Sequence, residues 1–432
     1  MKIKYIDLFC GIGGMRLGFE SALQSIGLIP EPVFSSEIKK HAIEAYKHNF
    51  NETPQGDITQ INAKTQMPNF DFLLAGFPCQ AFSVAGKRLG FEDTRGTLFF
   101  EIARILNEKK PKGFLLENVE GLATHNNGET LATMLGILTD LGYNTTHKIL
   151  DSKDFGLAQS RKRIYIFGGL GRVINMDSFV PRFSSLSDII DHAECAKHTE
   201  FTKKLLNNYD VKDILGKKIK DKRGGADNIH SWDFALKGEV SEEQKELLSL
   251  ILKYRRNKKW ATVHGIEWMD GMPLTLEMIS TFYSKGDIKK SLDDLVEKRY
   301  LVYEHPKRKH NNKRVYDTSK QKGYNIVTGK LSFEYSKILN PADIVPTLVA
   351  TDALRLGVPV ADGIRPLTVK EGLRLFGFPK SYSLDFLDPK KAFDLLGNTV
   401  CIPVIDYAAK CVLKSVLNEE CAKNVTVPRA VA

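Results

Sequence analysis

The first 170 or so residues alternate short apolar runs with amphipathic stretches, and this alternation restricts the fold more than any other feature. The apolar runs are five or six residues long and are typical of buried strands; they are 4–9, 31–35, 70–75, 113–117 and 163–167. The stretches between them carry apolar residues at helical spacing; they are 15–26, 41–49, 98–109 and 129–141. Strands that alternate with helices predict an α/β fold, with a largely parallel sheet covered on both faces.

The alternation is interrupted by a long polar segment that is rich in Lys and Asn, from about Val173 to Lys337. A second ordered block follows at Arg365–Leu417, with expected helices over 369–376 and 402–416. We therefore expect residues 1–172 and 363–432 to form one discontinuous domain and residues 173–362 a second, smaller one. No run of 18 apolar residues and no signal peptide is found, and six scattered cysteines without CxxC spacing favour a reducing cytoplasm and no metal site.

Almost all of the net charge of +10 comes from the middle of the chain. Between Lys197 and Ser336 there are 29 Lys and Arg against 20 Asp and Glu, an excess of +9. A basic segment inside a nearly neutral frame is typical of a module that binds a polyanion, although an ordinary solvated surface is the alternative on charge alone.

The order of elements within 240–318 is that of a winged helix-turn-helix, a common DNA-binding module. Helices are expected over 242–254, 275–283 and 288–298, with Asp287 as the N-cap of the third. Strands over 300–303 and 314–316 enclose a basic loop at 305–313. The alternative is a helical insertion that binds nothing.

Three features at the expected strand ends describe a site for a nucleoside cofactor. Asp7–Gly14 is a glycine-rich turn between the first strand and its helix, which lets a ligand approach the backbone and the helix N-terminus. Glu37 ends the second strand, where a carboxylate can bridge two ribose hydroxyls, and Asp57 ends the expected third, where it can accept a bond from an adenine amino group.

A cysteine and a carboxylate follow the next two strands. Cys79, in Gly76–Ser83, comes just after one strand, and Glu117 ends the other. Most lone cysteines are buried apolar residues. A thiolate beside a carboxylic acid can however attack an electron-poor ring while the acid protonates that ring.

Taken together, these elements resemble a bacterial DNA (cytosine-5)-methyltransferase of the restriction-modification type. The matching segments, in the family's order, are 9–14, Glu37, Asp57, 78–80, 117–119, 159–163, 365–371 and 397–400. The resemblance covers residues 1–170 and about 340–415. It implies a Rossmann-like S-adenosylmethionine-dependent methyltransferase fold, with 173–362 as the target-recognition domain.

The resemblance also implies the chemistry. Cys79 would attack C6 of a cytosine flipped out of the duplex, so that C5 takes a methyl group from S-adenosylmethionine and S-adenosylhomocysteine is released. Glu117 would protonate N3, and Arg161 and Arg163 would face the pocket, with Arg163 on the cytosine O2. The base that removes the C5 proton is left open, and solvent is one candidate.

The resemblance also implies which residues bind the cofactor and the DNA. The cofactor would contact residues of the glycine turn, the acidic strand ends and two later walls: Phe9, Gly11, Ile12, Gly14, Glu37, Ile38, Asp57, Ile58, Pro78, Leu98, Asn398 and Thr399. DNA would be held by a loop after the nucleophile and by the basic module: Gln80, Ser83, Lys87, Arg88, Arg95, Lys289, Lys290, Lys307, Arg308 and Lys309.

The resemblance implies a monomeric, nucleoid-associated bacterial enzyme that acts on double-stranded DNA and is paired with a cognate restriction endonuclease. One alternative keeps the chemistry but methylates tRNA; the long, basic segment 173–362 favours duplex DNA over it. Another is a catalytically silent DNA-binding regulator. The presence of Cys79, Glu117 and Asn398 argues against this alternative.

Overall fold

The computed structural model describes residues 1–78, 98–267, 271–311, 313–328, 333–349 and 352–423. The chain forms two compact units. Unit 1 comprises 1–190, 342–353 and 368–432, and unit 2 comprises 191–341 and 354–367. The division differs from the expected domains, because 173–190 and 342–353 pack with unit 1, whereas 363–367 belongs to unit 2.

Unit 1 is built on a six-stranded sheet in the order β2-β1-β3-β4-β6-β5. The strands are β1 (Lys2–Leu8), β2 (Ile29–Ser36), β3 (Phe72–Gly76), β4 (Gly113–Val119), β5 (Tyr143–Asp151) and β6 (Lys162–Leu170). The first four are mutually parallel, and β6 runs antiparallel to both of its neighbours. The predicted largely parallel sheet is thus confirmed, with β5 as an additional edge strand that the sequence pattern did not indicate.

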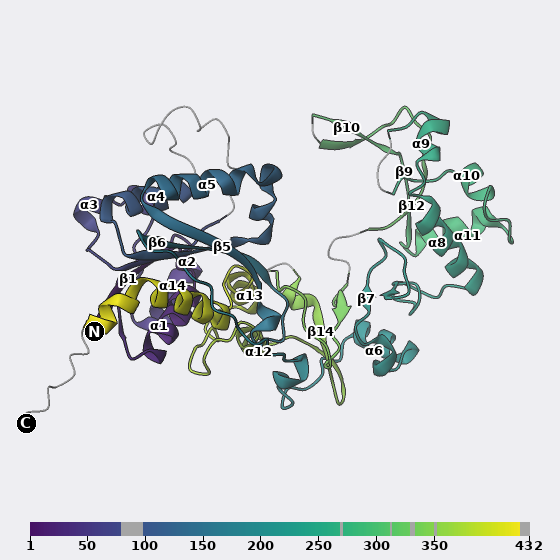
Figure 1. Cartoon of the computed structure of the whole chain (residues 1–432). Coiled ribbons are helices and arrows are strands. Elements are labelled where there is room, and N and C mark those ends of the chain that lie inside the picture. The colour runs from purple at the N-terminus through teal and green to yellow at the C-terminus, as the bar shows by residue number, and fades with distance from the viewer. Residues whose placement is uncertain (79–97, 268–270, 312, 329–332, 350–351, 424–432) are drawn as a thin grey trace, which may run out of the picture. The chain divides into compact units, whose positions relative to one another are not determined.

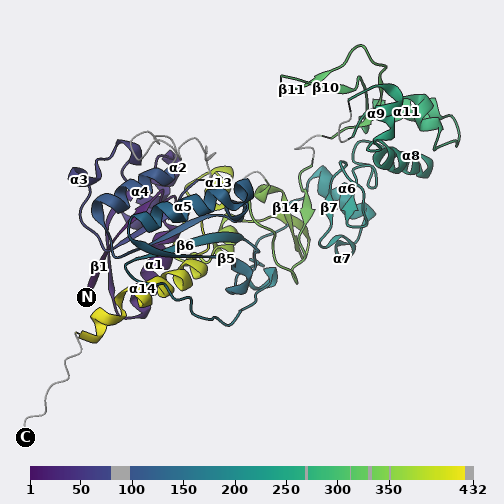
Figure 2. The ribbon, with the colours of Figure 1, turned by 45° about the horizontal axis from the view of Figure 1, so that its top comes forward.

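Helices cover both faces of this sheet (Figures 1 and 2). Helices α4 and α5 lie on one face, and α1 and α14 lie on the other. The helices of unit 1 are α1 (Gly14–Ser25), α2 (Lys40–Phe50), α3 (Ala63–Gln66), α4 (Leu98–Lys109), α5 (Glu129–Asp140), α12 (Val369–Leu375), α13 (Pro389–Gly397) and α14 (Ile402–Lys423). The side chains of Leu73, Leu116 and Ile164 in the sheet and of Ile102 in α4 are fully buried in the core between the layers.

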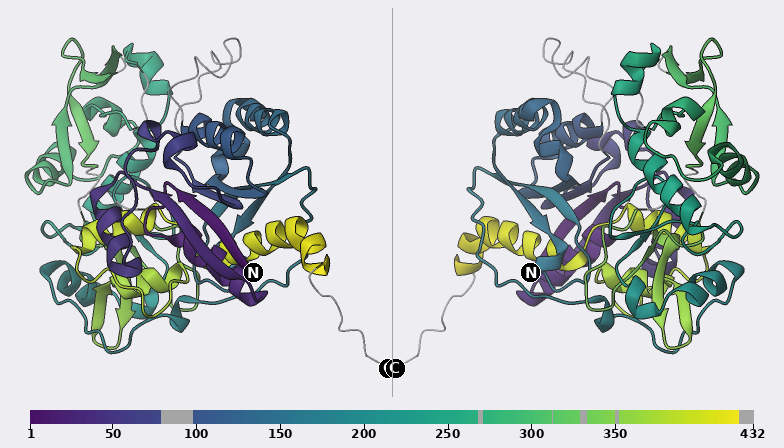
Figure 3. Two further views of the ribbon diagram at one scale, coloured as in Figure 1. Left: turned by 90° about the vertical axis from the view of Figure 1, so that its left-hand side faces the viewer. Right: turned by 90° about the vertical axis from the view of Figure 1, so that its right-hand side faces the viewer.

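The two ends of the chain pack together in unit 1. Figure 3 shows the yellow helix α14 beside the purple N-terminal elements. A Cβ atom at Gly18 in α1 would lie 2.4 Å from the Cβ of Ile405 in α14, so only glycine allows this approach. Ser21 Oγ donates a hydrogen bond of 2.8 Å to Asp406 of the same helix. Residues from the far end of the chain are thereby brought against the first strand-to-helix turn.

Unit 2 contains a five-stranded sheet in the order β15-β14-β13-β7-β8. Its strands are β7 (Lys218–Ile219), β8 (Asn228–Ile229), β13 (Lys337–Ile338), β14 (Leu356–Val360) and β15 (Gly363–Pro366). Helices α6 (Glu200–Asn208) and α7 (Val211–Ile214) accompany it. A cluster that includes Leu205, Ile214, Phe234 and Tyr335 forms its core.

A second core in unit 2 has the element order of a winged helix. The helices are α8 (Glu242–Tyr254), α9 (Lys259–His264), α10 (Leu276–Ser280) and α11 (Ile288–Glu297), followed by β9 (Leu301–Glu304), β10 (Lys307–His310), β11 (Lys313–Tyr316) and β12 (Gly323–Ile326). Leu274, between the helices, bridges to Tyr324 of β12, and β12 pairs with β9. Asp287 caps α11 through a 3.0 Å bond from Lys290 N–H, which confirms the predicted cap.

The strand pairing around the basic segment differs from the expectation. Residues 307–310 form a strand rather than a loop, and β10 pairs with β11 as a separate hairpin. The partner of β9 is β12, whose four residues are all buried, whereas β11 is mostly exposed. Burial of the apolar residues therefore selects the pairing.

No helix in the described part of the chain is long and apolar enough to cross a membrane.

Candidate active site

The glycine-rich turn after β1 has a left-handed backbone at three positions. Phe9, Gly11 and Gly13 have φ angles of 55°, 54° and 79°. A non-glycine residue such as Phe9 adopts this conformation only where the surrounding structure enforces it. The turn follows the carboxyl end of β1 and leads directly into α1, with Phe9 and Gly11 partly exposed.

Glu37 is aimed at this turn. One carboxylate oxygen of Glu37 accepts a 2.9 Å hydrogen bond from Gly11 N–H. The other oxygen accepts bonds of 2.8 Å from the N–H groups of Ile38 and Lys39. The Ile38 side chain is 70% exposed, which is unusual for isoleucine and leaves an apolar surface beside the carboxylate. The structure thus brings together three residues that the sequence placed in one cofactor site.

The segment around Asn398 closes on the same turn. A Cβ atom at Gly14 would lie 2.8 Å from Thr399 Oγ1 and 2.9 Å from Val400 Cγ2. Tyr382 donates a 2.7 Å bond to the carbonyl of Ile12. Asn398 is exposed at the end of α13, where its amide donates to the carbonyl of Asp394.

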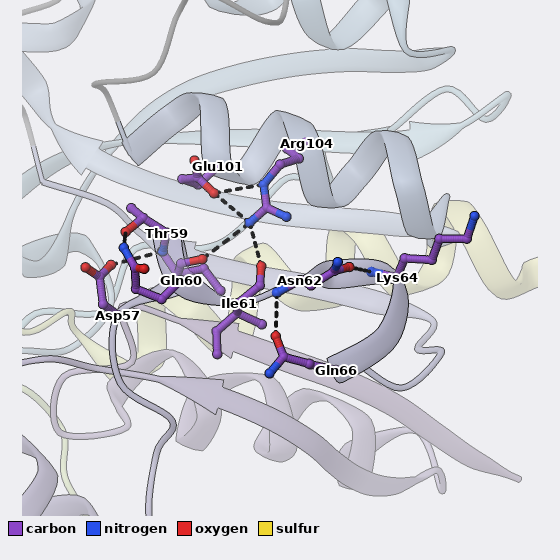
Figure 4. A network of polar contacts seen from close by, with 10 residues as sticks. Asp57, Thr59, Gln60, Ile61, Asn62, Lys64, Gln66, Glu101 and Arg104 are labelled. Atoms are coloured by element: carbon purple, nitrogen blue, oxygen red, sulfur yellow. Dashed lines mark hydrogen bonds and ion pairs between the residues drawn. The ribbon is translucent and has the colours of Figure 1, made fainter.

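Asp57 was expected at a strand end, and the structure places it at the N-cap of a 3₁₀ turn, Ile58–Gln60. Its carboxylate accepts a 3.0 Å bond from Thr59 N–H, and its side chain is exposed. Figure 4 shows how Arg104 of α4 holds this turn: its guanidinium donates to the carbonyls of Ile58 and Ile61 and to Glu101. Leu98 is the first residue of the same helix. Arg104 therefore holds the turn that follows Asp57 against the helix that begins at Leu98.

Two proposed cofactor residues are buried. The side chains of Ile12 and Ile58 are 1% and 3% exposed, and Ile58 belongs to the core of the sheet. Both remain predicted cofactor contacts, and their burial favours contact through the backbone.

Sequence reasoning assigned no role to Asp7, which is 1% exposed next to the glycine turn. Neither of its carboxylate oxygens has a hydrogen-bond partner within the described residues. Burial raises the pKa of Asp7 to about 8, although the Arg16 charge acts to lower it. Burial therefore favours the protonated form of Asp7.

Glu117 and Arg163 form an ion pair at the end of β4. Arg163 Nε lies 3.1 Å from Glu117 Oε1, and both side chains are largely buried. Burial raises the pKa of Glu117, while the charges of Arg163 and then Arg161 oppose the rise. A carboxyl group with a raised pKa beside an arginine can hold a proton for a bound base and position that base at the same time.

Arg161 differs from the expectation that it faces the pocket as Arg163 does. Its guanidinium donates to the carbonyls of Leu348 and Gly397, at 3.4 and 3.0 Å, and its side chain is buried against the Phe376 ring. Its contacts are those of a positioning residue that joins the Gln159–Arg163 segment to Gly397, next to Asn398.

Asn118 holds the backbone just after β3 in place. Sequence reasoning named this residue only as part of a motif and gave it no role. Its side-chain amide donates a 2.9 Å bond to the carbonyl of Phe77, and its oxygen accepts from Val119 N–H. Pro78 follows and is exposed. Cys79, Gln80, Ser83, Lys87, Arg88 and Arg95 lie outside the described residues.

The basic residues that were expected to bind DNA divide into two groups in unit 2. Lys289 forms an ion pair with Asp293 on the exposed face of α11, and Lys290 is exposed on the same helix. Lys307, Arg308 and Lys309 lie on β10 in the exposed hairpin. Sequence reasoning missed the cations of the opposite strand, Lys313 and Arg314, because it treated the preceding segment as a loop.

The fold and these contacts define an α/β protein with a nucleoside-type site and a buried acid at the carboxyl edge of one sheet. A family model described as C-5 cytosine-specific DNA methylase matches residues 3–414. The chain is 53% identical to the Type II methyltransferase M.NlaIV of Neisseria lactamica over 421 residues, which cover 95% of this chain and 99% of that protein. It is 40% identical to M.BanI of Aneurinibacillus aneurinilyticus over 445 residues, with 97% of each chain covered.

Solved structures support the fold. A prophage-encoded DNA modification methyltransferase from E. coli matches with a TM-score of 0.51 at 20% identity, covering 96% of this chain and 99% of that one. The S. pombe Dnmt2 methyltransferase matches with a TM-score of 0.50 at 17% identity, covering 95% and 98%. Both likenesses bear on the fold alone.

The chain belongs to the C-5 cytosine-specific DNA methylase family and is a DNA (cytosine-5)-methyltransferase. The predicted Rossmann-like methyltransferase fold is confirmed, and family membership implies S-adenosylmethionine as the methyl donor and DNA as the substrate. The tRNA alternative is less supported, since the relatives that match the whole chain are Type II DNA methyltransferases.

Proposed function

We propose that the reaction takes place at the Glu117–Arg163 pair, with Cys79 as the nucleophile. The thiolate of Cys79 forms a bond to C6 of the cytosine while the Glu117 carboxyl gives its proton to N3. C5 becomes nucleophilic and takes the methyl group. Loss of the C5 proton to solvent then expels the thiolate, and N3 returns its proton to Glu117.

The buried pair of Glu117 and Arg163 supports this proposal most strongly, and burial also raises the pKa of Glu117. A carboxyl group that is buried at the end of β4 favours its protonated form, which is the form that can donate to N3. Arg163 Nε lies 3.1 Å from the same carboxyl, which supports Arg163 as the donor to the cytosine O2. The Asn118 bond to Phe77 fixes the backbone two residues before Cys79.

S-adenosylmethionine supplies the methyl group, and the residues at the glycine turn fit it. Glu37 retains lone pairs for ribose hydroxyls after accepting from the backbone, and the exposed Ile38 offers an apolar surface for the adenine. Asp57 and Asn398 are exposed and can accept or donate bonds. Phe9, Gly11 and Gly14 form the turn, Pro78, Leu98 and Thr399 provide further walls, and Ile12 and Ile58 contribute backbone.

We propose that the enzyme is the protective partner of a restriction endonuclease, which the Type II names of its relatives support. In this role it methylates one cytosine in a defined duplex sequence. The basic residues of 173–362 and the segment after Cys79 hold the duplex while the base is flipped out, at a cost of a few kcal/mol.

Expression in cells that lack DNA methylation, followed by genome-wide mapping of 5-methylcytosine, tests this function. We expect methylation at a single short sequence motif, and none with Cys79→Ser, which should still bind S-adenosylmethionine. DNA without 5-methylcytosine alongside methylated tRNA would contradict the proposal, as would turnover by Cys79→Ser.

A further inference from the structure

The hairpin β10–β11, called the basic ribbon here and comprising residues 307–316 apart from Asn312, projects from the winged-helix core of unit 2 (Figure 2). Its strands pair Lys307 with Tyr316, Arg308 with Val315, Lys309 with Arg314 and His310 with Lys313. Successive side chains of a strand alternate between the two faces, and paired residues share a face. One face therefore carries Lys307, Lys309 and Arg314, and the other carries Arg308 and Lys313.

The charge on both faces of the basic ribbon opposes its own folding. Lys309 and Arg314 lie directly opposite each other, and like charges at such positions are destabilising. Lys309, Lys313 and Arg314 form no ion pair with any residue that the structure describes, and all three are exposed. An isolated two-stranded hairpin is at best marginally stable, so this charge pattern gives the free protein no advantage in stability.

The base of the basic ribbon, in contrast, is held by acidic residues. Glu304 accepts a 2.9 Å bond from Tyr316 and lies 3.6 Å from Lys307 Nζ. Glu267 accepts a 2.8 Å bond from the N–H of Lys309, and Asp317 N–H donates to the carbonyl of Pro306. The hairpin is thus anchored at its base and, through the Lys309 backbone, part-way along, while the side chains of Lys309, Lys313 and Arg314 stay exposed.

Helix α11 presents a different surface. Lys289 pairs with Asp293, and Lys298, just after the helix, pairs with Asp294 at 2.7 Å. Glu297 is also exposed, so three carboxylates accompany the cations on and next to this helix. A polyanion would meet compensated charge on α11 and uncompensated charge on the basic ribbon.

We propose that the basic ribbon enters a groove of duplex DNA, with each of its faces contacting the phosphates of one strand. This inference rests on the proposed function, since it takes duplex DNA as the substrate. The major groove, about 12 Å wide, admits a two-stranded ribbon. A ribbon lying flat on the duplex would need cations on one face only, whereas insertion between two phosphate backbones uses cations on both.

Neutralising each face separately tests the proposal. Lys309→Gln with Arg314→Gln removes two charges from one face, and Arg308→Gln with Lys313→Gln removes two from the other. Lys245→Gln with Lys285→Gln is the matched control, because these lysines pair with Glu242 and Glu246 elsewhere in unit 2. The full-length protein is titrated with a fluorescent duplex of random sequence between about 50 and about 200 mM salt.

Each face variant should lower the slope of log K against log salt by about 1.8, since each lost phosphate contact removes about 0.9. The combined variant should lose twice as much, and the control should keep the wild-type slope. Both face variants should unfold at or above the wild-type temperature, because they relieve repulsion between like charges. Folding damage is thereby separated from loss of binding.

A slope that changes for only one face would overturn insertion into a groove, and an unchanged slope for both would overturn the basic ribbon as a DNA contact. An equal loss in the control, or stronger competition by tRNA than by duplex DNA, would also overturn the proposal. Wild-type protein that forms no 5-methylcytosine would instead contradict the proposed function, so the two failures are distinguishable.

Discussion

Arg163 of β6 and Glu117 of β4 form a largely buried ion pair, with Nε 3.1 Å from Oε1. The antiparallel register that places Val119 opposite Arg163 brings the two side chains together. Burial and the arginine charge act on the carboxyl in opposite directions, and burial dominates, so the pKa of Glu117 is raised.

Glu117→Gln should reduce methyl transfer by at least about a hundredfold, because the amide keeps the shape of the side chain but has no proton to give to N3. S-adenosylmethionine affinity should stay unchanged. Single-turnover methylation of a duplex substrate measures the rate. Glu120→Gln, at an exposed position three residues away, serves as the control and should behave as wild type. A rate for Glu117→Gln close to that of wild type would exclude the acid role.

Arg161→Met should shift the pH dependence of activity. The Arg161 charge acts to lower the Glu117 pKa, so its removal raises that pKa and keeps the acid protonated to higher pH. The decrease in methylation rate at alkaline pH should therefore occur at a higher pH than in wild type. Arg161→Lys keeps the charge and should leave this limb in place, while both variants weaken cofactor binding through the lost bond to the Gly397 carbonyl. Identical pH profiles for all three proteins would argue against this account.

Glu37→Gln should weaken S-adenosylmethionine binding roughly tenfold to a hundredfold, since a hydrogen bond to a charged group contributes about 1.5–3 kcal/mol. The substitution also replaces one of the two acceptor oxygens by an NH2 group, so either Gly11 N–H or the N–H groups of Ile38 and Lys39 lose their acceptor. Calorimetric titration gives the dissociation constant. Glu31→Gln changes a carboxylate that pairs with Lys2 on the preceding strand and should bind normally. Equal affinities for the two variants would remove Glu37 from the site.

Asp7→Asn should flatten the pH dependence of stability. The folded protein keeps the Asp7 proton up to a pKa of about 8, whereas the unfolded chain releases it near the ordinary value of 3.8. Between these values the folded state binds more protons, so the free energy of unfolding falls as pH rises. The loss is at most about 1.4 kcal/mol per pH unit.

Urea unfolding of wild type and Asp7→Asn at pH values across this window checks the sign. The free energy of unfolding of Asp7→Asn, relative to that of wild type, should increase as the pH rises. Asp140→Asn, at an exposed position at the end of α5, should follow wild type at every pH. A constant difference would show that Asp7 is ionised in both states.

Strand and helix patterns predicted most of unit 1 because its central strands are uniformly apolar and its helices have clear periodicity. The edge strand β5 was missed, since Asn144, Thr145, His147 and Lys148 leave it without apolar alternation. An edge strand is buried mainly by its single neighbour, so its sequence carries a weaker signal. The position of Asp57 was wrong for a related reason, because Gln55 forms only an isolated bridge to Ser36 before the chain turns.

Side-chain direction could not be predicted from spacing. Arg161 and Arg163 alternate along the chain, yet one guanidinium pairs with Glu117 and the other binds two backbone carbonyls. The difference depends on the segments 342–353 and 397–400, which are distant in sequence. The pairing of β9 with β12 rather than β11 likewise depends on which strand is buried.

The packing of α1 against α14 has a consequence for how the protein is made. Ser21 and Asp406 are 385 residues apart in the chain, and Gly14 meets Thr399 beside them. Contacts of such high sequence separation slow folding, and during synthesis the second partner is made 385 residues after the first. The cofactor site can therefore close only after the chain has been synthesised through Thr399 and α14, long after the glycine turn itself has been made.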